Sequence, residues 1–242
     1  MTTFACHPER EGPHPPIIFF MDAPGIREEL RDMARRLASV GYYVLLPNLY
    51  YRSGLLEPGP IVRDPVTGRS QITPCLELLT VAGLMRDADS LIGFLDADPA
   101  AAPGPMGTVG YCMSARFAIN LAAHRPERVT AAASIYGTSL VTPEDDSLHL
   151  ATRRTNAELY FAVAEVDHWA PPDTVEALRA EVRSNGCRAE VEFFPGVEHG
   201  FAFPSRDAYS RAASERHWER LFALFRRGLP QPLAGFTADA RD

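Results

Sequence analysis

Short apolar runs alternate with longer amphipathic segments along this chain of 242 residues, and that alternation constrains its fold more than any other feature. The short runs have the length of buried strands, and the longer segments place their apolar residues at helical spacing. The expected strands lie at residues 17–21, 42–46, 106–111, 129–136, 159–164 and 189–194. The expected helices lie at residues 27–40, 76–95, 113–123, 172–184 and 206–225. This order predicts an α/β fold with a mostly parallel sheet, helices on both faces and right-handed crossovers.

The length of the chain fits one α/β domain, because such folds commonly take about 200–250 residues. We therefore expect a single domain over residues 1–242, with residues 228–242 as a C-terminal tail. Residues 52–74, rich in glycine and proline, follow the second expected strand. A loop of that length inside a compact domain is usually functional or mobile.

The chain contains no lysine, since all 24 of its Lys+Arg residues are arginine. This excludes Schiff-base chemistry on a lysine, a P-loop lysine and a Ser–Lys nucleophile pair. The formal net charge is −7 and no long basic run occurs, so a nucleic-acid partner is not expected.

The four cysteines, Cys6, Cys75, Cys112 and Cys187, form no C-x-x-C pattern of the kind that redox or zinc sites use. The N-terminus has no apolar segment typical of a signal peptide, and no apolar run approaches the roughly 20 residues that span a bilayer. We expect a cytoplasmic protein without a membrane partner, cofactor or metal, as a monomer or small homo-oligomer.

A nucleophile candidate lies between the strand at residues 106–111 and the following helix, in the sequence Gly110-Tyr111-Cys112-Met113-Ser114. Ligands of parallel α/β sheets bind beyond the carboxyl ends of the strands, so chemistry is expected at such positions. The pattern is that of a nucleophile elbow with Cys in place of Ser and with small residues two positions before and after it. The adjoining helix N-terminus favours a thiolate, and the N–H of Met113 points to where an oxyanion would form.

Two other interpretations apply to this segment. A free cysteine is often simply buried, which leaves a structural role for Cys112 open. Gly104, Gly107 and Gly110 are spaced three apart and do not form the G-x-G-x-x-G pattern of a dinucleotide site.

The expected base is His199, which follows the strand at residues 189–194 by a short loop. The α/β-hydrolase order is nucleophile, acid, histidine, so the acid should follow the strand at residues 159–164. Glu165, Asp167 and Asp173 qualify, and Asp167 is the best placed, whereas Asp173 also suits a helix cap. The remaining downstream histidines lie in helices or polar loops: His124, His149, His168 and His217.

These residues resemble the dienelactone hydrolase family. The resemblance is carried by the segment at residues 19–52 and by GYCMSA, AEVDHWAPP and VEHGFAF, which together extend from about residue 17 to residue 203. It implies an α/β-hydrolase fold with Cys112 as nucleophile, Asp167 as orienting acid and His199 as base. It also implies that the N–H of Ala23 is the second oxyanion donor.

The chain departs from the family pattern at two positions. Asp22 stands where the family has a glutamate that contacts the nucleophile, and we expect it to assist deprotonation of the thiol or to form a turn. Phe203 stands where the dienelactone-cleaving members have a substrate-binding arginine, which favours a less acidic, more apolar substrate. Arg52 aligns with an arginine common in the family and is the first candidate for a cation facing the pocket. The aromatic residues expected in the pocket, or alternatively in the core, are Tyr50, Tyr51, Trp169 and Phe203.

The sequence thus predicts a hydrolase that cleaves carboxylic esters or lactones through a Cys-His-Asp triad and a thioester intermediate. A non-catalytic small-molecule binder on the same fold is the alternative, because a fold alone does not give a function. A redox-sensing thiol is a third interpretation, for which no resolving cysteine is close in sequence.

Overall fold

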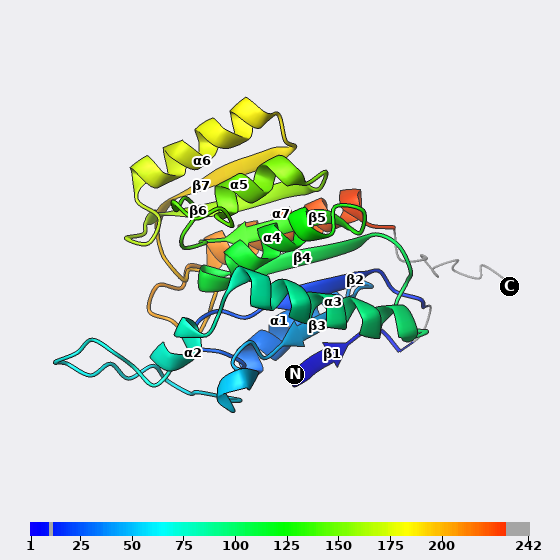
Figure 1. Ribbon diagram of the computed structural model, residues 1–242, viewed down its shortest axis with the longest axis horizontal. Helices are drawn as coiled ribbons and strands as arrows, with labels where there is room; N and C mark the ends of the chain where they lie inside the picture. The colour runs from blue at the N-terminus through cyan, green and yellow to red at the C-terminus, as the bar shows by residue number, and fades with distance from the viewer. Residues whose placement is uncertain (10–11, 231–242) are drawn as a thin grey trace, which may run out of the picture.

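A seven-stranded sheet runs through the centre of the protein in the computed structural model, which describes residues 1–9 and 12–230 (Figure 1). The strands are β1 (Thr3–Cys6), β2 (Pro16–Phe20), β3 (Tyr43–Pro47), β4 (Met106–Tyr111), β5 (Val129–Ile135), β6 (Glu158–Val166) and β7 (Ala189–Glu198). Their spatial order is β1-β3-β2-β4-β5-β6-β7, and each neighbouring pair is parallel except β1 with β3. The predicted mostly parallel α/β sheet is confirmed.

Helices cover both faces of the sheet. They are α1 (Glu28–Ala38), α2 (Thr73–Glu77), α3 (Val81–Ala97), α4 (Ala115–His124), α5 (Leu148–Ala151), α6 (Pro172–Asn185) and α7 (Arg211–Gly228), with short 3-10 turns η1 (Tyr51–Ser53), η2 (Cys112–Ser114) and η3 (Thr152–Arg154). On one face α1 and α7 lie together, and Arg36 of α1 pairs with Glu215 of α7 at 2.6 Å. The opposite face is covered by α3, α4 and α5, which lie in front of the sheet in Figure 1.

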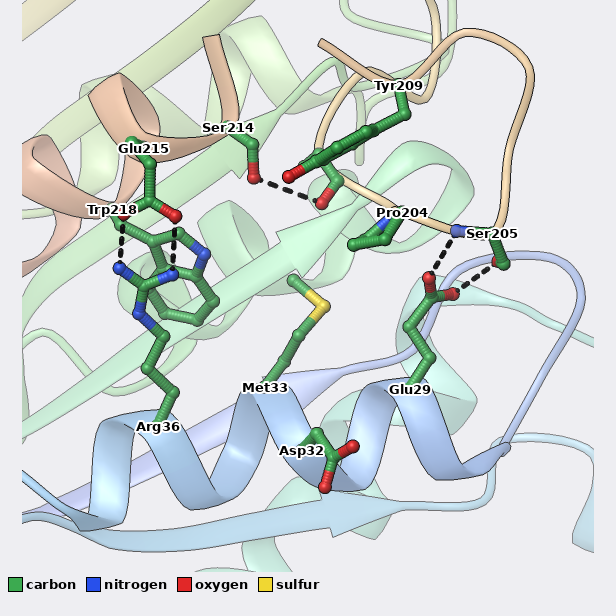
Figure 2. Close-up of a pocket in the computed structure, with 11 residues that line it drawn as sticks. Glu29, Asp32, Met33, Arg36, Pro204, Ser205, Tyr209, Ser214, Glu215 and Trp218 are labelled. Carbon is green, nitrogen blue, oxygen red and sulfur yellow. Dashed lines mark hydrogen bonds and ion pairs between the residues drawn. The ribbon is translucent and has the colours of Figure 1, made fainter. Parts of the chain in front are cut away.

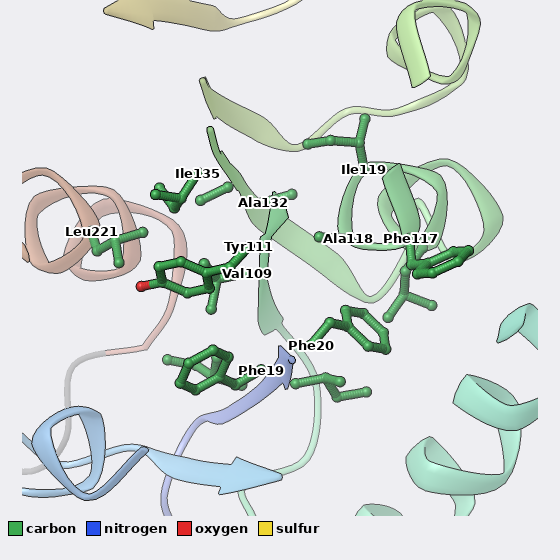
Figure 3. Packing of buried hydrophobic residues seen from close by; sticks show 14 of the residues in the cluster. Phe19, Phe20, Val109, Tyr111, Phe117, Ala118, Ile119, Ala132, Ile135 and Leu221 are labelled. Carbon is green, nitrogen blue, oxygen red and sulfur yellow. The ribbon is translucent and has the colours of Figure 1, made fainter. Parts of the chain in front are cut away.

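Large apolar side chains pack against the middle strands from both faces of the sheet (Figure 3). Every residue of β2 and β4 is buried. On the α7 face, Phe19 packs on Tyr111 with ring centroids 5.1 Å apart, and on the α4 face Phe20 packs on Phe117 at 6.5 Å. Successive strand residues point to opposite faces, so a strand buried on both sides needs an unbroken apolar run. This explains why these strands were visible in the sequence.

Two helix boundaries differ from the prediction because a hydroxyl caps the helix later than expected. The helix expected over residues 76–95 is divided into α2 and α3, because Thr80 is extended and its Oγ1 accepts from the N–H of Gly83 at 3.1 Å. The helix expected over residues 206–225 begins at Arg211, because Ser210 is extended and its side chain accepts from the N–H of Ala213. Residues 199–209 therefore form a loop, and this loop carries part of the site.

Two short elements were not predicted. The edge strand β1 is half-exposed and has no apolar run, and α5 lies inside what the sequence presented as a polar loop. The expected tail over residues 228–242 falls mostly outside the described residues, since the description ends at residue 230. Within the described residues, no helix is long and apolar enough to cross a membrane.

Candidate active site

Four of the candidate residues follow the carboxyl ends of parallel strands. Asp22 follows β2, Cys112 follows β4, Asp167 follows β6 and His199 follows β7. Because these strand ends meet at one edge of the sheet, the topology gathers the four residues there. This is the place at which the sequence predicted the chemistry to lie.

The turn after β4 is the strained elbow that the sequence predicted. Cys112 has a φ of 56°, in the left-handed region that non-glycine residues seldom adopt. A Cβ on Gly110 would lie 2.4 Å from the carbonyl oxygen of Ser114, so only glycine fits at that position. The Ser114 hydroxyl accepts from the N–H of Tyr111 at 3.2 Å and lies 3.1 Å from the carbonyl oxygen of Phe20. Ser114 is therefore accommodated because its hydroxyl joins β4 to the end of β2.

Asp167 and His199 form a hydrogen-bonded pair in which the carboxylate is buried and the imidazole is partly buried. His199 Nδ1 lies 2.8 Å from Asp167 Oδ2, and Asp167 Oδ1 accepts from the N–H of Trp169 at 2.9 Å. Burial by itself acts to lower the pKa of His199. Hydrogen bonds to Asp167 and to the Cys112 thiol, together with the charges of both groups, outweigh burial and raise the pKa to about 9. His199 is thus hydrogen-bonded to Asp167 and lies within electrostatic reach of Cys112.

Tyr50 connects the two segments that carry the candidate oxyanion donors. Its side chain is buried, and its hydroxyl donates to the carbonyl of Ala23 at 2.7 Å and lies 3.7 Å from Met113 Sδ. The Ala23 segment is a tight turn, closed by the N–H of Gly25 on the carbonyl of Asp22 at 2.9 Å. Among the described residues the N–H of Ala23 has no acceptor. It is therefore available to a ligand.

Two arginines that the sequence analysis did not select hold the Asp22 carboxylate. Arg27 donates to Asp22 Oδ1 at 2.6 Å, and Arg206 donates to Asp22 Oδ2. Both guanidinium groups stack on the buried ring of Phe203, with Cζ 4.7 Å and 5.2 Å from its centroid. The cations at this site therefore come from positions 27 and 206. Their signal in the sequence was weak, because an arginine in a loop after a strand has many other uses.

The residues expected to line the pocket have other contacts. Arg52 forms two hydrogen bonds with Asp87, at 2.6 and 2.7 Å, and stacks on Tyr51. Trp169 is half-exposed and its ring contacts that of His168 at a tilt of 43°, whereas Tyr50 and Phe203 are buried. A cavity of about 890 Å³ beside His199 is lined by other residues: Pro24, Arg27, Gly59, Pro60, Ile61, Glu198, Ser205, Arg206, Asp207 and Ala208.

Glu29 of α1 fixes the loop that carries His199 and Arg206. Its carboxylate accepts from the N–H and the hydroxyl of Ser205, at 2.9 and 2.8 Å, and from Arg27 Nε at 2.9 Å. Figure 2 shows Glu29 reaching Ser205 at one side of a cavity of about 590 Å³ between α1 and α7, with Met33 at its base. The loop after β7 is thus tied to the helix after β2.

Comparisons with known proteins identify relatives of this chain. A family model described as the dienelactone hydrolase family matches residues 1–229. A candidate carboxymethylenebutenolidase of Escherichia coli strain K12 is 27% identical over 232 residues, which cover 93% of this chain and 82% of that protein.

Solved structures of related proteins show the same fold. A candidate dienelactone hydrolase from Klebsiella pneumoniae has a TM-score of 0.81 at 24% identity, covering 93% of this chain and 92% of the other. A dienelactone hydrolase-like promiscuous phosphotriesterase from metagenomic libraries has a TM-score of 0.74 at 21% identity, covering 94% and 92%. The predicted α/β-hydrolase fold is confirmed. The chain belongs to the dienelactone hydrolase family and is an ester or lactone hydrolase.

Proposed function

We propose that the protein hydrolyses its ester or lactone substrate by covalent catalysis, with Cys112 as nucleophile, His199 as base and Asp167 as the residue that orients His199. The observation that carries this proposal is the hydrogen bond between His199 Nδ1 and Asp167 Oδ2, with the Cys112 thiol among the groups that raise the pKa of His199. Its Nδ1 is held by the carboxylate, which leaves Nε2 for the thiol proton. The raised pKa of His199 enables the imidazole to hold this proton once it has been transferred.

In this mechanism the thiolate attacks the substrate carbonyl and forms a tetrahedral oxyanion. The N–H groups of Met113 and Ala23 bind that oxyanion, with Tyr50 supporting both segments. His199 then protonates the leaving alkoxide, which leaves a thioester on Cys112. Water activated by His199 hydrolyses the thioester and restores the thiol.

Asp22 has a different part in this proposal from the one first expected. Both of its oxygens accept from guanidinium groups, and its side chain is fully buried. We therefore assign proton removal to His199, and we assign to Asp22 the placement of Arg27 and Arg206 at the cavity.

The charges around the cavity indicate the class of substrate. Arg27 and Arg206 line it together with the acidic side chains Glu198 and Asp207. Because the two signs are balanced, the cavity favours a neutral or weakly acidic ester or lactone over a strongly charged one.

The proposal is tested by comparing wild type with Cys112→Ala on a panel of nitrophenyl esters and small lactones. Wild type should turn over members of the panel, and the variant should lose on the order of 10⁴-fold or more in kcat, as enzymes do when the nucleophile is removed. Retained activity in Cys112→Ala would exclude Cys112 as the nucleophile.

The same variant set separates the hydrolase from a non-catalytic binder. Stoichiometric iodoacetamide labelling of Cys112 in wild type, lost in His199→Ala, supports an activated nucleophile. Equal labelling of all four thiols favours the binder.

A further inference from the structure

Tyr136 lies in the turn after β5, against the nucleophile elbow. It is not a member of the proposed triad. Its φ is 36°, in the left-handed region that a tyrosine seldom adopts. Two residues later, the N–H of Thr138 donates to the carbonyl of Cys112 at 3.1 Å. A Cβ on the intervening Gly137 would lie 2.7 Å from the Cβ of Ala115, so this turn packs closely on the first residue of α4. The turn and the elbow therefore position one another.

The ring of Tyr136 packs directly against the candidate base. Its centroid lies 5.0 Å from that of His199, at an interplanar angle of 63°, and 5.2 Å from that of Phe201. The residue is 1% exposed. Phenylalanine would fill the same space, so packing does not explain the hydroxyl.

That hydroxyl is buried and has no hydrogen-bond partner among the described residues. The neighbouring Tyr111 differs, because its hydroxyl lies 3.1 Å from His217 Nε2. Burying an unpaired hydroxyl costs free energy, so an orphan of this kind next to a catalytic group requires an explanation.

The Cys112 thiol and the Asp22 carboxylate are both among the groups that act electrostatically on the Tyr136 hydroxyl. The oxygens of Asp22 are taken by Arg27 and Arg206. Burial, followed by the charge of Asp22, raises the pKa of Tyr136 well above its ordinary value, so the hydroxyl keeps its proton and acts as a donor. The titratable and charged groups that face Tyr136 and Cys112 are Asp22, Tyr50, Tyr111, His199 and Arg206.

We propose that Tyr136 is a further catalytic residue, whose hydroxyl donates a hydrogen bond to the Cys112 sulfur once the thiol has become a thiolate. The thiol proton passes to His199, and Tyr136 keeps its own proton throughout. A neutral thiol is a weak acceptor and a thiolate is a strong one, which explains why the hydroxyl has no partner in the resting site. This inference rests on the proposed role of Cys112.

The test is the rate of alkylation of Cys112 by iodoacetamide between pH 5 and pH 10, followed by peptide mass spectrometry. Loss of one hydrogen bond to a charged group is expected to cost about tenfold. Tyr136→Phe should therefore raise the midpoint of the alkylation profile by about one pH unit and lower kcat/KM on nitrophenyl acetate about tenfold, with an equal or higher Tm. A fluorinated tyrosine at position 136, a stronger donor of nearly the same shape, should move the midpoint in the opposite direction.

Tyr160→Phe is the matched control, because it removes a buried hydroxyl that is bonded to Glu192 at 2.9 Å on β7. Its alkylation profile should equal that of wild type. Unchanged profiles in both Tyr136 variants would overturn the role of Tyr136, whatever their effect on Tm. Absence of selective Cys112 labelling in wild type would instead overturn the proposed nucleophile, so the two failures are distinguishable.

Discussion

At the residue scale, His199 and His217 have opposite electrostatic environments, although both belong to one cluster of aromatic rings around Tyr111 and Tyr136. His199 is paired with Asp167 and Cys112, and its pKa is raised to about 9. His217 is fully buried in α7, and burial lowers its pKa to about 3. Its Nδ1 bonds the carbonyl of Ser214 and its Nε2 meets the hydroxyl of Tyr111. One histidine is therefore suited to hold a proton during catalysis, and the other is suited to remain neutral.

The neutral state of His217 predicts an acid-dependent loss of stability. Between about pH 6.5 and pH 3 the unfolded chain binds a proton at this residue and the folded chain does not, so stability falls as the pH falls through that window. From pH 6.5 to pH 4 the loss is roughly 3 kcal/mol. Urea unfolding at several pH values measures it. His217→Gln, which does not titrate, should flatten this part of the curve, and an unchanged slope in that variant would contradict the assignment.

The residues of the site differ in how far the sequence reveals them. The positions of Cys112, Asp167 and His199 were predictable because each comes at or shortly after the end of a recognisable strand. In the structure β6 and β7 extend to Val166 and Glu198, further than predicted, and His199 Nδ1 lies 2.8 Å from Asp167 Oδ2. Arg206 was not predictable, because it meets Asp22 across 184 positions of the chain and only the folded loop after β7 brings it there. Long-range ion pairs leave no local pattern in the sequence.

At the scale of elements, the loop between β7 and α7 owes its position to contacts with α1. The Glu29 carboxylate joins Ser205 of the loop to Arg27 beside the cavity. The loop also carries His199 and Arg206, so a change in α1 is expected to alter the positions of these two side chains.

This coupling predicts different effects for two acidic residues of α1. Glu29→Gln should lower kcat/KM about tenfold, because one charge-assisted bond is lost and the loop is repositioned. Asp32→Asn should change kcat/KM less than about twofold, because within residues 1–9 and 12–230 Asp32 pairs only with Arg35, at 2.6 Å, and its side chain is 69% exposed. Steady-state kinetics on one nitrophenyl ester compares them, and equal effects would argue against the role of Glu29.

Element boundaries have three kinds of cause, which are apolar spacing, side-chain caps and pairing with a distant strand. The strands and the amphipathic face of α1 were visible because apolar spacing is local, and Leu30, Met33, Ala34 and Leu37 are all buried. The starts of α3 and α7 depend on the Thr80 and Ser210 caps, which apolar spacing alone does not reveal. β1 was missed because it has no apolar run and is recruited by pairing with β3.

At the scale of the whole molecule, the parallel strands bring the candidate catalytic residues together at their carboxyl ends. One long loop lies outside the packed body. Residues 62–71 of that loop project in Figure 1 and form a small hairpin with a bridge between Arg63 and Ser70. Val62 and Val66 in this hairpin are 71% and 91% exposed. The root of the same loop, Gly59 to Ile61, lines the cavity beside His199.

The exposure of the hairpin predicts that the fold does not depend on it. Replacing residues 63–70 by a two-glycine turn should change the free energy of unfolding by less than about 1 kcal/mol, because little apolar surface is lost. Ile72→Ala, at a residue only 2% exposed, should cost about 2–5 kcal/mol. Denaturant unfolding compares the two changes. A deletion as costly as Ile72→Ala would mean that the hairpin packs on the body.

The most direct test of the central claim is the site of covalent attachment during turnover. Wild type is mixed with excess nitrophenyl acetate, quenched in acid within milliseconds, and mapped by peptide mass spectrometry. The account predicts an acetyl group on the peptide containing Cys112, as a hydroxylamine-sensitive thioester that is absent in Cys112→Ala. An acetyl group on another residue that forms and decays at the rate of turnover, with Cys112 unmodified, would contradict it.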